Sequence, residues 1–205
     1  MKRLDALPTI LKLQQIFKLG YVPSRGGQSY RIAENGIIKN YASIPNCFAH
    51  ACFNLTNEQL ARFNEADFRA FRGFVQSVFH MNNYIAKDLF DFVKECGLKV
   101  QRSNGKLPKY SNEWKVALYF GTERFKKDYH FLLLEKDGTW SSKIGCESEI
   151  KYFDFPPKEL MCNYEYPYQL YGIFKITNPF ADRQKLHEGQ YDNSKSNHFE
   201  VEKNI

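Results

Sequence analysis

The sequence predicts an α+β fold in which N-terminal helices pack on a C-terminal antiparallel β-sheet. In the first half of the chain, apolar residues recur every three or four positions, as on the buried face of an amphipathic helix. After Gly97 the pattern changes to short apolar runs bounded by turn residues, which is typical of strands. Asp137-Gly138 separates two of these runs, and Asp-Gly between apolar runs is a strong signal for a β-hairpin.

The chain length favours one main domain. With 205 residues, the chain can bury a core of ordinary size but cannot form two large domains. We divide it into an N-terminal amphipathic helix within residues 1–21, an α+β domain at residues 22–180 and a polar C-terminal tail at residues 181–205. The first helix has its apolar residues at helical spacing and ends at Gly20. Docking of this helix on its own domain is the simpler interpretation, and docking on a partner is the alternative.

The remaining elements follow from periodicity and from helix- and strand-breaking residues. The Pro and Gly residues of 22–46 predict a loop. Helices are predicted at residues 47–53, 56–63, 67–81 and 84–96. Strands are predicted at residues 98–101, 114–120, 129–135, 139–144 and 168–177, and residues 149–155 form a further short strand or a loop.

Charge and cysteine content argue against several classes of function. The net charge of +6 comes mostly from scattered Lys and Arg residues, so nucleic-acid binding is not expected. The five cysteines form no CxxC pair and lie at no zinc-ligand spacing with the histidines. A disulfide framework is therefore not expected either, and we predict a reducing compartment and no cofactor.

No classical signal peptide or transmembrane segment is predicted. Leu4–Leu19 is interrupted by charged and amide side chains, so it lacks the continuous apolar region of a signal peptide. No apolar run approaches the roughly 18 residues of a membrane helix. We therefore expect a soluble protein that is cytoplasmic, or that is delivered into a host cell without a classical signal peptide.

Asn46-Cys47 forms the first half of a candidate catalytic site. Asn46 is a suitable N-cap, so Cys47 is predicted to begin a buried helix. At that position the backbone N–H groups and the helix dipole stabilise an anion, which lowers the pKa of a thiol and favours the nucleophilic thiolate. The backbone N–H of Cys47 could also donate to an oxyanion.

His130 forms the second half of the site. It lies in the predicted strand at 129–135. A histidine on a strand beside the helix can take the proton of the Cys47 thiol and later protonate the leaving group. The two residues together predict a thiol–imidazole dyad.

This arrangement resembles the papain-like superfamily of cysteine hydrolases, which includes NlpC-like peptidases and amidases and bacterial effector proteases. The resemblance covers roughly residues 40–178 and rests on Asn46-Cys47 at the start of a helix and on Tyr129-His130-Phe131 on a strand. It implies that Cys47 is the nucleophile, that His130 is the general base, and that a polar residue on the following strand orients the imidazole.

Several residues are candidates for this third position. The following strand offers only Ser141 and Ser142, and a serine cannot stabilise an imidazolium by charge. Asp137 in the predicted turn is a carboxylate that could reach back to the imidazole, and we include Ser142 and Asp137 among the candidate catalytic residues. Glu147 and Asp154 are further acids that could do the same.

The oxyanion hole and the remaining polar residues leave more alternatives. Gln28 and Asn46 are candidates for the amide that often completes the oxyanion hole in this superfamily. Cys52 shows that the helix accepts a cysteine as ordinary core, and His130 could likewise be a hydrogen-bonded core residue. His50 lies three residues from Cys47, where helical geometry makes it a poor base, so we interpret it as structural.

These observations predict a cysteine-dependent protease or amidase that acts on a protein or peptide substrate through a thioester intermediate. The alternative is a catalytically inactive papain-like binding module that holds a protein partner. The lack of an acid or amide on the strand after His130 favours this alternative.

Overall fold

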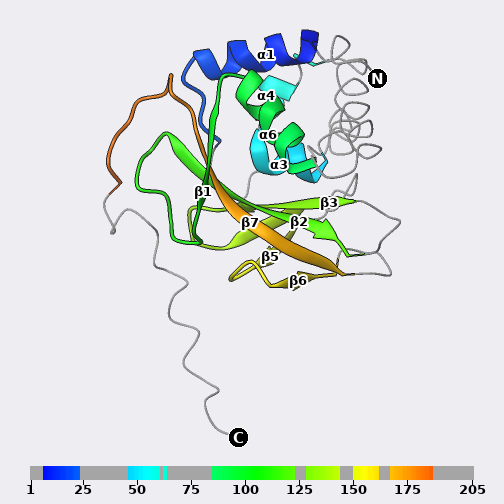
Figure 1. The fold of residues 1–205 in the computed structure, drawn as a ribbon. Helices are drawn as coiled ribbons and strands as arrows, with labels where there is room; N and C mark the ends of the chain where they lie inside the picture. The colour runs from blue at the N-terminus through cyan, green and yellow to red at the C-terminus, as the bar shows by residue number, and fades with distance from the viewer. Residues whose placement is uncertain are drawn as a thin grey trace, which may run out of the picture.

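The computed structural model describes residues 7–23, 46–60, 62–63, 85–122, 128–143, 150–161 and 167–186. In this part of the chain, helices lie on one side of a large antiparallel sheet (Figure 1). The predicted α+β class, with helices preceding the sheet along the chain, is therefore confirmed. The helix predicted at residues 67–81 and most of the predicted C-terminal tail lie outside the described residues.

Four helices are described, and two of them are followed by a glycine that ends the helix. They are α1 (Leu7–Lys18), α3 (Cys47–Cys52), α4 (Asn57–Leu60) and α6 (Ile85–Glu95). Gly20 and Gly97 follow α1 and α6 with φ values of +83° and +91°, a backbone conformation that favours glycine and closes a helix. α1 contributes buried apolar residues to the core, which agrees with docking on its own domain.

The strands form one sheet in which every described pairing is antiparallel. They are β1 (Lys99–Ser103), β2 (Glu113–Gly121), β3 (Tyr129–Leu134), β4 (Trp140–Lys143), β5 (Ile150–Phe153), β6 (Glu159–Leu160) and β7 (Tyr168–Thr177). The spatial order is β1-β7-β2-β3-β4-β5, and the short β6 pairs with β7. The predicted Asp-Gly hairpin joins β3 to β4, and Gly138 in its turn has a φ of +88°.

The sheet has two buried faces, which we call the helix face and the far face. Alternate residues of a strand point to opposite faces. On β3, Tyr129, Phe131 and Leu133 join the core under the helices. Leu132 and Leu134 join a second core on the far face. β5 and β6 lie on the far side of the sheet from the helices (Figure 1), and Leu160 of β6 packs into this second core.

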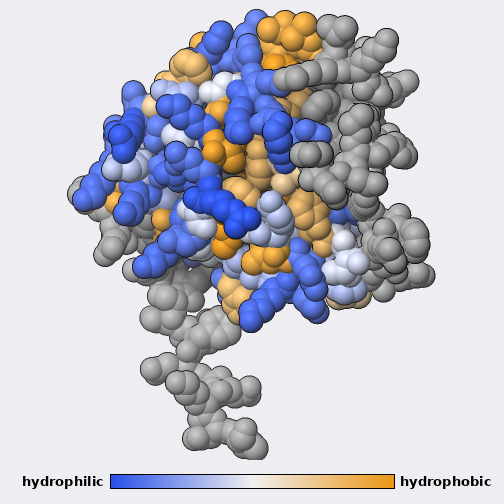
Figure 2. Space-filling model, in the orientation of Figure 1, coloured by the Kyte–Doolittle hydropathy of each residue, from blue (hydrophilic) through white to orange (hydrophobic). Residues whose placement is uncertain are grey.

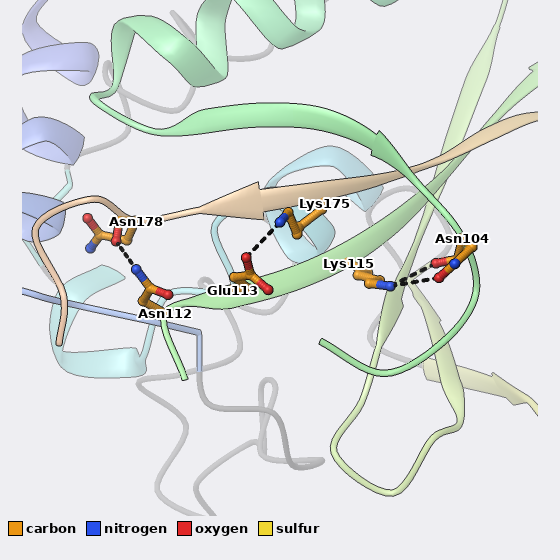
Figure 3. Close-up of polar contacts among 6 residues, drawn as sticks. All are labelled: Asn104, Asn112, Glu113, Lys115, Lys175 and Asn178. Carbon is orange, nitrogen blue, oxygen red and sulfur yellow. Dashed lines mark hydrogen bonds and ion pairs between the residues drawn. The ribbon is translucent and has the colours of Figure 1, made fainter. Parts of the chain in front are cut away.

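Asn178, immediately after β7, connects α1, β2 and the end of the sheet (Figure 3). Its side-chain nitrogen donates to the carbonyl oxygens of Phe17 at 2.9 Å and Tyr21 at 2.7 Å. Its side-chain oxygen accepts from the Phe180 N–H at 2.9 Å, and its carbonyl accepts from the Asn112 side chain at 3.0 Å. Asn178 is fully buried, and its hydrogen bonds with Phe17 and Asn112 are buried with it, so water does not readily replace these two bonds.

We expect Asn178→Ala to lower the free energy of unfolding by about 1–3 kcal/mol, because it removes the side-chain donor of the Tyr21 carbonyl and one of the two donors of the Phe17 carbonyl. Asn178→Asp keeps the shape of the side chain but removes both donors, so it is expected to destabilise at least as much. Urea unfolding measures both changes, with Gln169→Ala, an exposed amide on β7, as the control. A loss no larger than that of the control would contradict this role.

Candidate functional site

Cys47 begins α3, as predicted. The Asn46 side-chain oxygen accepts from the Ala49 N–H at 3.0 Å, so Asn46 is the N-cap of the helix. The Cys47 side chain is buried on the helix face, where its sulfur lies 4.0 Å from the carbonyl oxygen of Tyr129. The thiol therefore sits above the first residue of β3, next in sequence to His130.

His130 points away from the helices. It lies between Tyr129 and Phe131, which both pack on the helix face, so alternation directs its imidazole to the far face. There its Nε2 lies 2.7 Å from the Ser142 hydroxyl, and its ring packs edge-on against Tyr168 at 6.3 Å. Burial lowers the pKa of His130 to about 3, so the imidazole is neutral near pH 7.

The described structure thus brings together only part of the predicted site. Ser142, on the strand after His130, contacts the imidazole as the third residue was expected to do. The Cys47 thiol and the His130 imidazole do not meet, because the one lies under the helices and the other projects from the opposite face of β3. A strand one residue out of step would have placed both on the same face.

Asp137, which was a candidate to orient the His130 imidazole, contacts Thr139. Its carboxylate accepts from the Thr139 N–H at 3.0 Å within the β3–β4 turn. It therefore stabilises the hairpin turn. Asp154 is exposed after β5, and Gln28 and Glu147 lie outside the described residues.

A second buried polar group lies on the helix face and connects α3 to the β3–β4 hairpin. His50 Nε2 is 3.0 Å from the Ser141 hydroxyl, and that hydroxyl donates to Glu135 at 2.5 Å. Ser141 was considered as a partner of His130, but it lies on the opposite face from Ser142 and contacts His50 instead. Glu135 was missed, although its place at the end of the apolar run at 129–134 could have indicated a buried acid.

Burial shifts the pKa values of His50 and Glu135 in this His50–Ser141–Glu135 chain toward their uncharged forms. Desolvation, with a contribution from Lys143, lowers the pKa of His50 to about 3. Desolvation also raises the pKa of Glu135 to about 7, although the Ser141 hydrogen bond acts in the opposite direction. The chain therefore contains one group, Glu135, that titrates near neutral pH.

The described residues contain no group of three or more His, Cys, Asp or Glu residues arranged to hold a metal ion. No helix among them is long and apolar enough to cross a membrane. Cys52 and Cys96 are buried in the core, and burial raises the pKa of both thiols.

Glu135→Gln should change how stability depends on pH. The pKa of Glu135 is raised in the folded state, so its carboxyl stabilises the fold below its unfolded pKa of about 4.3 and loses that contribution as pH rises through about 7. The buried His50 and His130 have the opposite slope below pH 6.5, so the variant must be compared with the parent chain. Relative to that chain, Glu135→Gln should gain up to about 3 kcal/mol between pH 4.5 and pH 7.5.

Urea unfolding at several pH values measures this difference, and Glu159→Gln, an exposed carboxylate on β6, provides the control. A pH-independent difference between Glu135→Gln and the parent chain would contradict the raised pKa.

Comparison with known proteins gives no relative from which a function could be transferred. No family model matches the chain. No curated protein and no solved structure matches it either. The function is therefore inferred from the geometry of the described residues.

Proposed function

We propose that this protein is a binding protein that holds a protein partner, and that Cys47 and His130 are structural residues within it. This corresponds to an inactive papain-like binding module. The observation that carries the proposal is the placement of the two side chains on opposite faces of β3. A general base must come within hydrogen-bond reach of the proton that it takes, directly or through one water molecule.

The environment of each residue supports a structural role. The His130 imidazole is hydrogen-bonded to Ser142 and buried in the far-face core. Its pKa of about 3 makes it a weak base. The Cys47 side chain is only 6% exposed, so a substrate carbonyl has little access to its sulfur. α3 has only six residues, so its dipole is smaller than that of a long helix.

Support for partner binding comes from large apolar side chains that remain exposed. They include Tyr152, Phe155 and Met161 around β5 and β6, and Tyr171 on β7. Figure 2 shows hydrophobic side chains at the surface where the helices meet the sheet, with β1 and β7 toward the viewer. Aromatic residues and Met are enriched at protein–protein interfaces, where their large apolar surfaces become buried.

A cysteine-dependent hydrolase is the second candidate. It is favoured by the 2.7 Å contact between His130 and Ser142 on neighbouring strands, which is the contact expected of a base and its orienting residue. The N-cap at Asn46 and the closeness of Cys47 to the start of β3 also fit this function. For a dyad to form, the start of β3 would have to rearrange so that the imidazole reaches the helix face.

Iodoacetamide labelling near neutral pH distinguishes the two functions. We expect Cys47 to react more slowly than a small-molecule thiol, because its sulfur is buried and the His130 imidazole lies on the other face of β3, and we expect His130→Ala to leave this rate unchanged. Peptide mapping by mass spectrometry locates the label, and labelling in urea shows that every cysteine can react once it is exposed.

Selective and rapid modification of Cys47 that is lost in His130→Ala would overturn the binding proposal in favour of the hydrolase. Ser142→Ala provides a milder second variant, because it keeps the imidazole and removes only its hydrogen-bond partner. A rate that falls in Ser142→Ala as well would assign Ser142 as the orienting residue.

A further inference from the structure

The net charge of the protein comes from two segments of the chain. Residues 99–115 and 175–186 contain eight basic and two acidic residues, so together they carry the whole net charge of +6. The rest of the chain has equal numbers of basic and acidic residues. The eight basic residues are Lys99, Arg102, Lys106, Lys109, Lys115, Lys175, Arg183 and Lys185.

The fold brings these two segments side by side. β1 pairs with β7 along its whole length. Beyond the strands, Tyr110 forms an antiparallel bridge with Lys185, and the Leu186 N–H donates to the Lys109 carbonyl at 2.9 Å. Figure 1 shows the connection between β1 and β2 beside the segment that follows β7. Cations that are far apart in the sequence therefore share one region, and we call the two paired segments the basic surface.

The acidic side chains offset little of this charge. Glu113, one of the two acids, pairs with Lys175 at 2.7 Å (Figure 3). Burial lowers the pKa of Lys115, and although Glu113 acts in the opposite direction, Lys175 and Lys109 lower this pKa further. Their effect on a third lysine indicates a positive potential in this region. An anion would be attracted to it.

Two arginines of the basic surface are held over tyrosine rings. The Arg183 guanidinium lies 3.8 Å from the centroid of the Tyr110 ring, and the Arg102 guanidinium lies 5.3 Å from that of Tyr171. Neither arginine forms an ion pair with a described carboxylate. A guanidinium stacked on an aromatic ring keeps its N–H groups free to donate in its own plane, in a geometry that matches phosphate oxygens.

The exposed residues around these cations are polar. In residues 99–109 and 182–186, the exposed residues other than the cations are Gln101, Asn104, Gly105, Asp182 and Gln184. Figure 2 shows hydrophilic side chains, in blue, over the side of the molecule where Figure 1 places the connection between β1 and β2. Lysine is depleted at protein–protein interfaces, whereas protein–nucleic acid interfaces are more polar and more positively charged. Lys, Arg, Asn and Gln side chains all donate to phosphates there.

We infer that the basic surface binds the phosphate backbone of a nucleic acid without reading its base sequence. Nucleic-acid binding was not expected, because the basic residues are scattered along the sequence, and the pairing of the two segments is what gathers them. This inference goes beyond the protein partner proposed above. The exposed apolar side chains of Tyr152, Phe155 and Met161 lie outside the basic surface, so the two ligands would contact different residues.

Fluorescence anisotropy with a labelled single-stranded DNA of mixed sequence and about 16 nucleotides tests the inference. Lys106→Gln/Lys109→Gln/Lys185→Gln removes three exposed cations from the basic surface. We expect this variant to bind at least about tenfold more weakly than the parent chain at about 0.1 M salt. The slope of log Kd against log salt concentration should fall by about two, because each lost phosphate contact of a single strand contributes about 0.7.

A matched variant separates this surface from net charge alone. Lys136→Gln/Lys151→Gln/Lys158→Gln also removes three exposed lysines, but outside the basic surface. It should keep the affinity of the parent chain, because exposed charges more than about 10 Å away are largely screened at 0.1 M salt. An equal loss of affinity in the two variants would overturn the inference.

A competitor separates a nucleic acid from an acidic protein. Polyglutamate at the same concentration of negative charge should displace the DNA much less than unlabelled DNA does. Equal displacement would identify an acidic protein partner and overturn the inference. Absence of binding to both the single strand and its duplex at about 0.05 M salt would overturn it as well. None of these outcomes depends on Cys47, so the labelling experiment tests the proposed function separately.

Discussion

The packing of Phe48 between the helices and β3 is the interaction on which the candidate site depends. The Phe48 ring lies 5.4 Å from Phe131 and 6.4 Å from Tyr129 on β3, and it also contacts Phe53 and Phe92. α3 has only six residues, and a helix of that length has little stability on its own. Aromatic contacts with the sheet therefore hold α3 in place, and they set the position of Cys47 above the start of β3.

The same packing determines which polar groups share a face of the sheet. Once Phe131 is under α3, the alternation of β3 directs His130 to the far face, where Ser142 contacts it. On β4, Ser141 points to the helix face and joins His50 and Glu135. Each histidine thus has a serine partner, and the sheet separates the two pairs. A dyad between Cys47 and His130 would require breaking this packing arrangement.

The ionisable groups in the described interior differ in charge state from those at the described surface. Inside, histidines and a glutamate are uncharged near or below neutral pH because burial penalises their charged forms. At the surface, β1 carries the exposed basic side chains of Lys99 and Arg102, and Tyr171 of β7 is exposed beside Arg102. The His50–Ser141–Glu135 chain connects α3 to the β3–β4 hairpin, while the exposed groups are available for the partner binding that we propose.

The sequence alone determined the order and type of the described elements, apart from the short β6, where no strand was predicted. Helical periodicity, Gly20, Gly97 and the Asp137-Gly138 turn are local signals, and they correctly predicted α1, α6 and the β3–β4 hairpin. The N-cap at Asn46 was predictable for the same reason, since a cap depends on residues within one helical turn.

Only the tertiary structure decided which side chains meet. Whether His130 faces Cys47 depends on which apolar residues of β3 pack under α3, and both alternating sets, Tyr129-Phe131-Leu133 and His130-Leu132-Leu134, contain residues that a core accepts. When both faces of a strand are buried, alternation of polar and apolar residues no longer identifies the inner face. For this reason the sequence predicted the contact between strands that carry His130 and Ser142, but not the separation of His130 from Cys47.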